Sequence, residues 1–188
     1  SGVELFYQLD RRRHAPAPAR NFNILANNWG AGSGSKNICE ALILKEIDTA
    51  AALGLTHVQL DTGWQAGIRH GWLNVEDAIP KSPYAISPDY WRIHSERFPR
   101  GFQPLAERAR EKGVRLGFWF APDASNDYAN WEKDRDTVLA LARDYGFDAV
   151  KIDGVAIKSK TGERNFLAFL DGVFQGANRK IFINYDIT

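Results

Sequence analysis

Short apolar runs alternate with helix-like stretches along most of this chain. Five runs have the length and composition of β-strands: residues 21–27, 57–61, 115–120, 150–153 and 180–184. Helical patterns lie between them, over residues 35–53, 102–112, 131–145 and 162–175, and Gly54 and Gly113 are predicted to end two of these helices. Because every strand is short and every crossover contains a helix, the pattern predicts an α/β fold with a parallel sheet covered by helices.

The alternation alone fits both an open sheet and a closed barrel. Three of the strands end in Asp or Trp at the same relative place, which favours a barrel whose loops build one shared mouth. A complete eight-fold barrel needs about 250 residues, and this chain has 188. We therefore predict a (β/α)8 TIM barrel, of which about the first five strands are present over residues 20–188.

The first residues are expected to lie outside this barrel. Residues 1–9 could form a strand, and residues 11–18 read as an extended linker because the prolines disfavour helix. The start of the chain lacks the basic-then-apolar pattern of a signal peptide. Residues 1–19 are interpreted as a join to a preceding domain.

Composition excludes several partners. The formal net charge is +1, which argues against nucleic acid or an anionic membrane as the main partner. No apolar run approaches the roughly 20 residues that span a bilayer. Cys39 is the only cysteine, so no internal disulfide can form, and it is expected to be an inert buried thiol within the helix at 35–53.

Two acids end predicted strands. In the fourth strand Lys151 and Asp153 share one face, since side chains alternate along a strand. Asp61 ends the second strand and shares a face with His57 and Gln59. Ligands bind at the carboxyl ends of parallel strands, so a cation and carboxylates at this place suit a hydroxyl-rich ligand. The alternative is a buried ion pair that only stabilises the end of the strand.

Other site types fit the sequence poorly. The glycine-rich loop at 28–35 lacks the Gly-Lys-Ser/Thr ending of a phosphate-binding loop. No two histidines stand at the spacing of a metal-binding motif; the four are His14, His57, His70 and His94. His57 begins its strand, far from the carboxyl end, and is expected to be a core histidine. We expect no metal and no cofactor. The long connection at 65–98 is expected to shape a pocket.

Five motifs occur in order along the chain. They are Asn27-Asn28-Trp29, Leu60-Asp61-Thr62-Gly63-Trp64, Phe98-Pro99-Arg100-Gly101-Phe102, Gly117-Phe118-Trp119-Phe120-Ala121-Pro122 and Lys151-Ile152-Asp153. The series resembles the catalytic barrel of glycoside hydrolase family 36, the α-galactosidases and their relatives. Each motif is weak alone, and the resemblance rests on all five at matching barrel positions between Phe22 and Asp153.

The resemblance implies a retaining exo-α-glycosidase that hydrolyses terminal α-galactosides. Asp153 matches the nucleophile, Lys151 the lysine that bonds sugar hydroxyls, and Asp61 the first acid of a galactose-binding pair. Trp29, Trp64 and Trp119 match tryptophans that line the pocket. The implied partner is an oligosaccharide or glycoside substrate, and homo-oligomerisation stays open. The family's preceding β-sandwich domain would contribute residues 1–19.

The sequence departs from the family pattern at three places. Thr62 stands where the second galactose-binding aspartate is expected, and Val155 where an asparagine follows the nucleophile. The ending Asn184-Tyr185-Asp186 lacks the Cys-Ser-Gly-Gly-Gly run. The general acid/base is expected after strand six, beyond Thr188; Asp186 is the nearest acid, and Asp123 is interpreted as a turn acid or an outer pocket residue.

Two alternatives follow from these departures. The substrate could be another α-sugar, such as an α-N-acetylgalactosaminide. The barrel could also be a catalytically silent carbohydrate-binding domain, although a scaffold has no need of the Lys151/Asp153 pair. A metal-dependent barrel enzyme is a third hypothesis, which the histidine spacing disfavours.

Overall fold

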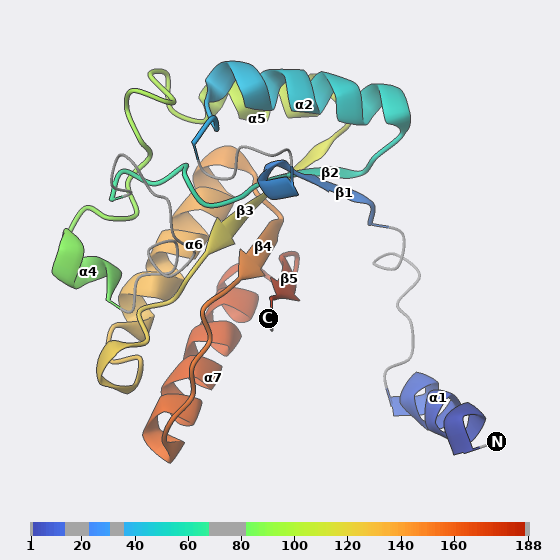
Figure 1. Cartoon of the computed structure of the whole chain (residues 1–188), viewed down its shortest axis with the longest axis vertical. Helices are drawn as coiled ribbons and strands as arrows, with labels where there is room; N and C mark the ends of the chain where they lie inside the picture. The colour runs from blue at the N-terminus through green and yellow to red at the C-terminus, as the bar shows by residue number, and fades with distance from the viewer. Residues whose placement is uncertain (1, 14–22, 31–35, 68–81, 187–188) are drawn as a thin grey trace.

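The computed structural model describes residues 2–13, 23–30, 36–67 and 82–186. Within them, five parallel strands form one sheet in the spatial order β1-β2-β3-β4-β5. The strands are β1 (Leu25–Asn27), β2 (His57–Leu60), β3 (Arg115–Phe120), β4 (Ala149–Ile152) and β5 (Phe182–Tyr185). Since spatial order equals chain order and helices fill the crossovers, the fold is a partial (β/α) TIM barrel, as predicted (Figure 1).

Helices connect the strands on each crossover. The long ones are α2 (Glu40–Leu53), α5 (Gln103–Lys112), α6 (Trp131–Tyr145) and α7 (Lys160–Gly176). The short elements are α4 (Pro83–Ile86) and the 3-10 turns η1 (Asn28–Gly30) and η2 (Ser125–Asp127). Helix α2 packs beside α5, and α6 beside α7 (Figure 1). In the described part of the chain no helix combines the length and apolarity that a membrane span requires.

Most predicted elements are confirmed, some with shifted ends. β3 and α6 have the predicted bounds, whereas β5 begins two residues later and ends one residue later than the predicted strand at 180–184. Gly54 and Gly113 end α2 and α5 with φ values of 73° and 69°, a left-handed backbone that glycine adopts at little cost.

The predicted start of the first barrel helix is wrong. Helix α2 begins at Glu40, and Cys39, predicted inside the helix, is its N-cap residue with extended backbone. Its thiol, predicted to be buried, is half-buried. The expected cap, Ser35, lies outside the described residues. The helix starts directly after Cys39, whose carbonyl accepts the first helical hydrogen bond, from Ile43 N at 3.1 Å.

The predicted N-terminal strand is also wrong. Residues Gly2–Arg13 form helix α1. Strand alternation breaks at the adjacent Leu5 and Phe6, while Glu4 and Gln8 stand four residues apart and hydrogen-bond at 3.3 Å. The extended linker expected over 11–18 is wrong for residues 11–13, which belong to α1, and its other residues lie outside the described part of the chain. The assignment of 1–19 to a preceding domain stays a prediction.

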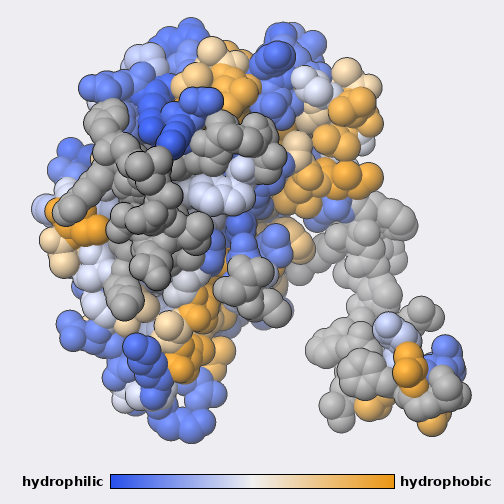
Figure 2. Space-filling view, in the orientation of Figure 1, coloured by the Kyte–Doolittle hydropathy of each residue, from blue (hydrophilic) through white to orange (hydrophobic). Residues whose placement is uncertain are grey.

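The two faces of the sheet have different chemistry. Val58, Leu60, Phe118, Val150 and Ile152 are buried against the helices on the outer face. Paired residues in neighbouring strands point to the same side, so the inner face carries the alternate residues, among them the polar site side chains. Figure 2 shows mostly hydrophilic side chains on the surface, with smaller hydrophobic patches between them.

The long connection between β2 and α5 is partly outside the described residues, at 68–81. Its ends lie close together, because Gln65 forms an antiparallel bridge with Ile93. Its aromatic side chains Tyr90 and Trp91 are buried against the core, with ring centroids 4.9 Å apart. Trp91 also packs on Trp119 and Phe120 at the carboxyl end of β3, so this part of the connection lies next to the candidate site.

Candidate active site

The polar residues at the carboxyl ends of β1 to β5 converge on the inner face of the sheet. In the register Trp119 pairs with Lys151 and Lys151 pairs with Asn184, so these side chains point to the same side. Asp153 continues β4 by one residue, donating its backbone N–H to Phe120 O at 3.0 Å. This alternation brings together residues that are up to 90 positions apart.

Both carboxylate oxygens of Asp153 accept a hydrogen bond. Trp119 Nε1 donates to Oδ2 at 2.8 Å, and the backbone N–H of Gly154 donates to Oδ1 at 2.7 Å. Asp153 is partly exposed, so a ligand can reach its carboxylate from solvent. Two donors of fixed direction hold the carboxylate in one orientation.

Lys151 lies between two carboxylates. Its Nζ is 3.2 Å from Asp61 Oδ2 and 2.9 Å from Asp186 Oδ2, with a side chain that is 13% exposed. Burial opposes the charge of Lys151, but the hydrogen bond to Asp186 and the charge of Asp61 outweigh burial and raise its pKa. The lysine therefore stays charged at neutral pH.

Asp61 is nearly buried, and protein donors surround it. Its Oδ2 accepts from Asn27 Nδ2 and its Oδ1 from the backbone N–H of Thr62, both at 2.8 Å. Its own backbone N–H donates to Asn28 Oδ1 at 2.8 Å. Asn27 at the end of β1 and Asn28 directly after it thus fix the acid that follows β2.

The three predicted pocket tryptophans have different environments. Trp29 in η1 is 39% exposed, and its backbone N–H donates to Asn27 Oδ1. Trp119 is buried and touches Asp153 through its indole. Trp64 is 0% exposed, and its Nε1 donates to Trp119 O at 2.8 Å. Trp64 therefore packs behind Trp119, and its role in lining the pocket stays a prediction.

Thr62 and Val155, which depart from the family pattern, both make contacts inside the protein. Thr62 is buried, and its Oγ1 accepts from Gln65 Nε2 at 3.0 Å while Gln65 Oε1 accepts from Gly63 N at 2.8 Å. Val155 packs against the hydrophobic core. The partnerships made by Gln65 and Asp186 were not predicted, because residue spacing carries no signal for them.

Two other predicted residues lie away from the site. His57 is buried at the start of β2, where its Nε2 is 3.4 Å from Asp148 Oδ1. Asp123 is fully buried in the turn after β3, accepting from Ser125 N at 3.0 Å and Asn130 Nδ2 at 2.8 Å. Asp123 is therefore a turn acid with no exposed surface. Among the described residues, no group of three or more His, Cys, Asp or Glu side chains is arranged to hold a metal ion.

Comparison with known proteins identifies a family and several relatives. The Melibiase family model matches residues 4–146. α-Galactosidase Mel36A of Lactobacillus acidophilus is 28% identical over 116 residues, which are 62% of this chain and 14% of that protein. α-Galactosidase AgaA of Geobacillus stearothermophilus is 29% identical over 122 residues, 64% of this chain and 15% of that protein. The chain thus spans about a seventh of the length of these curated relatives.

Solved structures share the fold. AgaA of Geobacillus stearothermophilus, a glycoside hydrolase family 36 α-galactosidase, has a TM-score of 0.64 at 19% identity, covering 88% of this chain and 28% of that one. α-Galactosidase I of Mortierella vinacea has a TM-score of 0.61 at 19% identity, covering 90% of this chain and 42% of that one. The Melibiase match ends before β4, so Lys151 and Asp153 lie beyond it. Because the match covers well over half of the sequence, this chain belongs to the melibiase family.

Proposed function

We propose that this chain forms part of the catalytic barrel of a retaining exo-α-glycosidase acting on terminal α-galactosides, with Asp153 as the nucleophile. The observation that carries the proposal is the carboxylate of Asp153 at the end of β4, held by Trp119 and Gly154 at 2.8 and 2.7 Å and partly exposed. A nucleophilic carboxylate needs a fixed direction of attack, and the two donors fix the orientation of the Asp153 carboxylate.

The barrel is proposed to continue beyond the five strands described. Within the described residues β1 and β5 each pair on one side only. A groove of about 730 Å³ also lies along α7 and β5, lined by apolar residues that include Leu167, Phe174 and Ile183. Residues 20–188 are accordingly assigned to the N-terminal part of the barrel, with the general acid/base after the sixth strand.

The proposed reaction is a double displacement. The Asp153 carboxylate forms a bond to the anomeric carbon while the glycosidic C–O bond breaks, and a second carboxyl group about 5–5.5 Å away protonates the departing oxygen. That second group then takes a proton from water, and the resulting attack at the anomeric carbon releases the sugar and regenerates Asp153. In this chain Lys151 shares a strand face with Asp153, and Lys151 and its two partner carboxylates are proposed to bind sugar hydroxyls.

The substrate assignment rests on the relatives. Solved structures of AgaA variants are complexes with 1-deoxygalactonojirimycin, stachyose and raffinose. Lys151, Asp61 and Trp119 are proposed to contact the terminal sugar, and Trp29 to lie at the rim. Trp64 is assigned to the support of Trp119.

A second substrate is favoured by one observation. Thr62 replaces a carboxylate at a sugar-contacting position and is buried with Gln65 as its partner. A missing acceptor weakens recognition of the hydroxyl it would bind, so the pocket could prefer a modified galactoside such as an α-N-acetylgalactosaminide.

The test is hydrolysis of a panel of nitrophenyl α-glycosides by the full-length protein, beside Asp153→Ala. We expect turnover of the α-galactoside or α-N-acetylgalactosaminide and a loss of at least about a thousandfold in the variant. Asp144→Ala, at an exposed acid on α6 away from the α7/β5 groove, is the control that keeps activity. Sugar binding without turnover in the wild type would instead identify a silent carbohydrate-binding barrel.

A further inference from the structure

The turn after β3 carries unusual backbone strain. Asn126, Asp127 and Tyr128 have φ values of 47°, 58° and 60°, three consecutive non-glycine residues in the left-handed region. Asn and Asp enter this region at modest cost, but a tyrosine there costs about 1–2 kcal/mol. Strain of this kind persists only where the surroundings impose it, and it concentrates at functional sites.

Two buried acids impose this conformation. Asp123 accepts from Ser125 N and Asn130 Nδ2, so it bridges the two ends of the turn. Asp134 of α6 accepts from Asp123 N through Oδ2 at 2.8 Å and from the Tyr84 hydroxyl through Oδ1 at 2.8 Å. The turn is therefore anchored both to α6 and, through Tyr84 of α4, to the connection that follows β2.

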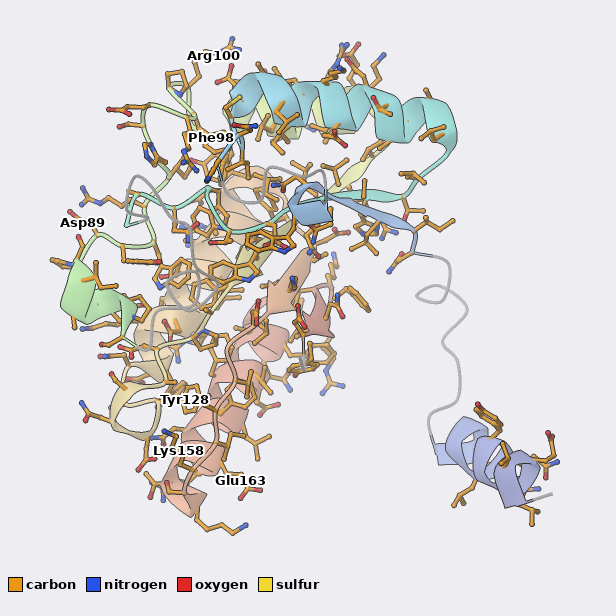
Figure 3. All side chains as sticks on the ribbon, in the orientation of Figure 1. Asp89, Phe98, Arg100, Tyr128, Lys158 and Glu163 are labelled. Atoms are coloured by element: carbon orange, nitrogen blue, oxygen red, sulfur yellow. The ribbon has the colours of Figure 1, made fainter. Side chains whose placement is uncertain are left out.

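The strain directs Tyr128 toward the connection between β4 and α7. Tyr128 is 1% exposed, its ring lies 5.2 Å from that of Phe166 in α7, and its hydroxyl oxygen accepts the backbone N–H of Ala156 at 2.8 Å. Asn165 Nδ2 of α7 also donates to Asp127 O at 2.9 Å. Figure 3 shows Tyr128 beside the segment that leads to Lys158.

The contact at Ala156 is close to Asp153 along the chain. Only Gly154 and Val155 separate the two residues, and Gly154 supplies the N–H that holds Asp153 Oδ1 at 2.7 Å. Gly154 itself has a φ of 66°, so this backbone would gain conformational freedom if its far end were released. Fixing Ala156 therefore fixes the peptide group that orients Asp153.

We propose that Tyr128 is a positioning residue: its left-handed backbone aims the hydroxyl at Ala156 N, which holds the 154–156 backbone and thereby the Asp153 carboxylate. The link to catalysis rests on the proposed function, while the link to the backbone does not. Tyr128 touches neither a substrate nor the reacting atoms, so its effect is on the orientation of the nucleophile.

The experiment compares Tyr128→Phe with Tyr145→Phe in the full-length protein. Tyr128→Phe keeps the ring against Phe166 and removes only the hydroxyl. Tyr145 lies at the end of α6, packed on Phe102 with centroids 5.6 Å apart, and serves as the control for loss of a phenolic oxygen. Two readouts are measured: kinetics on a nitrophenyl α-galactoside, and amide hydrogen exchange of the peptide covering residues 153–158.

We expect Tyr128→Phe to lower kcat about five- to tenfold with KM within twofold, as the loss of one hydrogen bond predicts. Exchange at 153–158 is expected to rise at least about fivefold, and Tyr145→Phe changes neither quantity. Unchanged exchange at 153–158 overturns the proposal, and so does faster exchange with an unchanged kcat. Wild-type protein that hydrolyses no α-glycoside would refute the proposed function instead, and amide exchange would still decide whether Tyr128 holds the backbone.

Discussion

The indole Nε1 of Trp119 donates a hydrogen bond of 2.8 Å to Oδ2 of Asp153 across neighbouring strands. Trp119 is fixed in turn, because its carbonyl accepts from Trp64 Nε1 at 2.8 Å and its ring lies 5.9 Å from that of Trp91. The proposed nucleophile is thus supported by an aromatic core rather than by a mobile side chain, which makes each layer of that support open to test.

Trp119→Phe tests the hydrogen bond to Asp153. We expect kcat for an aryl α-galactoside to fall about 10- to 100-fold, since a bond to a charged acceptor contributes about 1.5–3 kcal/mol. Trp91→Phe is the matched control: Trp91 belongs to the same cluster, but its buried Nε1 has no hydrogen-bond partner among the residues that the structure describes. Equal losses of kcat in the two variants would contradict a specific role for the Trp119 indole.

Lys151→Met tests the ion pairs with Asp61 and Asp186. Removing the cation leaves two carboxylates facing each other, one of them buried. We therefore expect the free energy of unfolding to fall by about 2–4 kcal/mol relative to the wild type. Lys160→Met removes an exposed ion pair with Glu163, and we expect it to lower the free energy of unfolding by less than about 1 kcal/mol. Urea denaturation of both variants at pH 7 makes the comparison.

The same variant has a pH signature. The pKa of Lys151 is raised in the folded state, so its contribution is fully present below its unfolded pKa of about 10.4 and is lost as pH rises through the folded pKa. The stability difference between wild type and Lys151→Met is therefore expected to be constant from pH 8 to about 10 and to shrink above that. A difference that grows with alkaline pH would show that the lysine is not stabilised by its partners.

Asp134→Asn tests the buried acid behind the strained turn. Burial raises the pKa of Asp134 to about 7, above its ordinary value of 3.8, so the folded state binds the proton more tightly. Wild-type stability is therefore highest at low pH with respect to this group, and it declines as pH rises from about 4 to 7. Asn resembles the protonated carboxyl and does not titrate, so the variant keeps its stability as the wild type loses it. At pH 8 we expect its free energy of unfolding, relative to the wild type, to be about 2–4 kcal/mol higher than the same difference at pH 4.

The control for this prediction lies on the same helix. Asp136 is exposed and pairs with Arg135 at 2.8 Å, so Asp136→Asn should follow the wild-type pH profile. Thermal unfolding of the three proteins between pH 4 and 8 measures the difference. Parallel profiles for wild type and Asp134→Asn would mean that Asp134 remains ionised in the folded protein.

Gly117→Ala tests close packing on the inner face. A Cβ at this position would lie 3.0 Å from Ala149 Cβ and 3.3 Å from Ala149 O, and backbone cannot move easily within a sheet. We expect a loss of about 1–3 kcal/mol in unfolding free energy. In the double variant with Ala149→Gly the side-chain clash is absent, so the combined loss should be smaller than the sum; simple additivity would contradict the clash.

The local sequence determined the order of the elements and the ends of several of them. Alternating apolar runs and helical periods predicted β3 and α6 with their bounds, and Gly54 and Gly113 ended their helices as expected. Strand alternation also placed Lys151 and Asp153 on one face. These features depend on neighbours within a few residues, which the sequence displays directly.

Tertiary structure decided which distant groups meet and which are exposed. Lys151 reaches Asp61 and Asp186, Trp64 is buried beneath Trp119, and Tyr128 reaches Ala156, all through side chains brought together by strand order. The predicted strand at the N-terminus became helix α1 because its short alternation was too weak to outweigh helix propensity. Periodicity fixes the face of a residue, whereas its partners and its burial depend on how β1 to β5 pack against one another, and no local pattern encodes that packing.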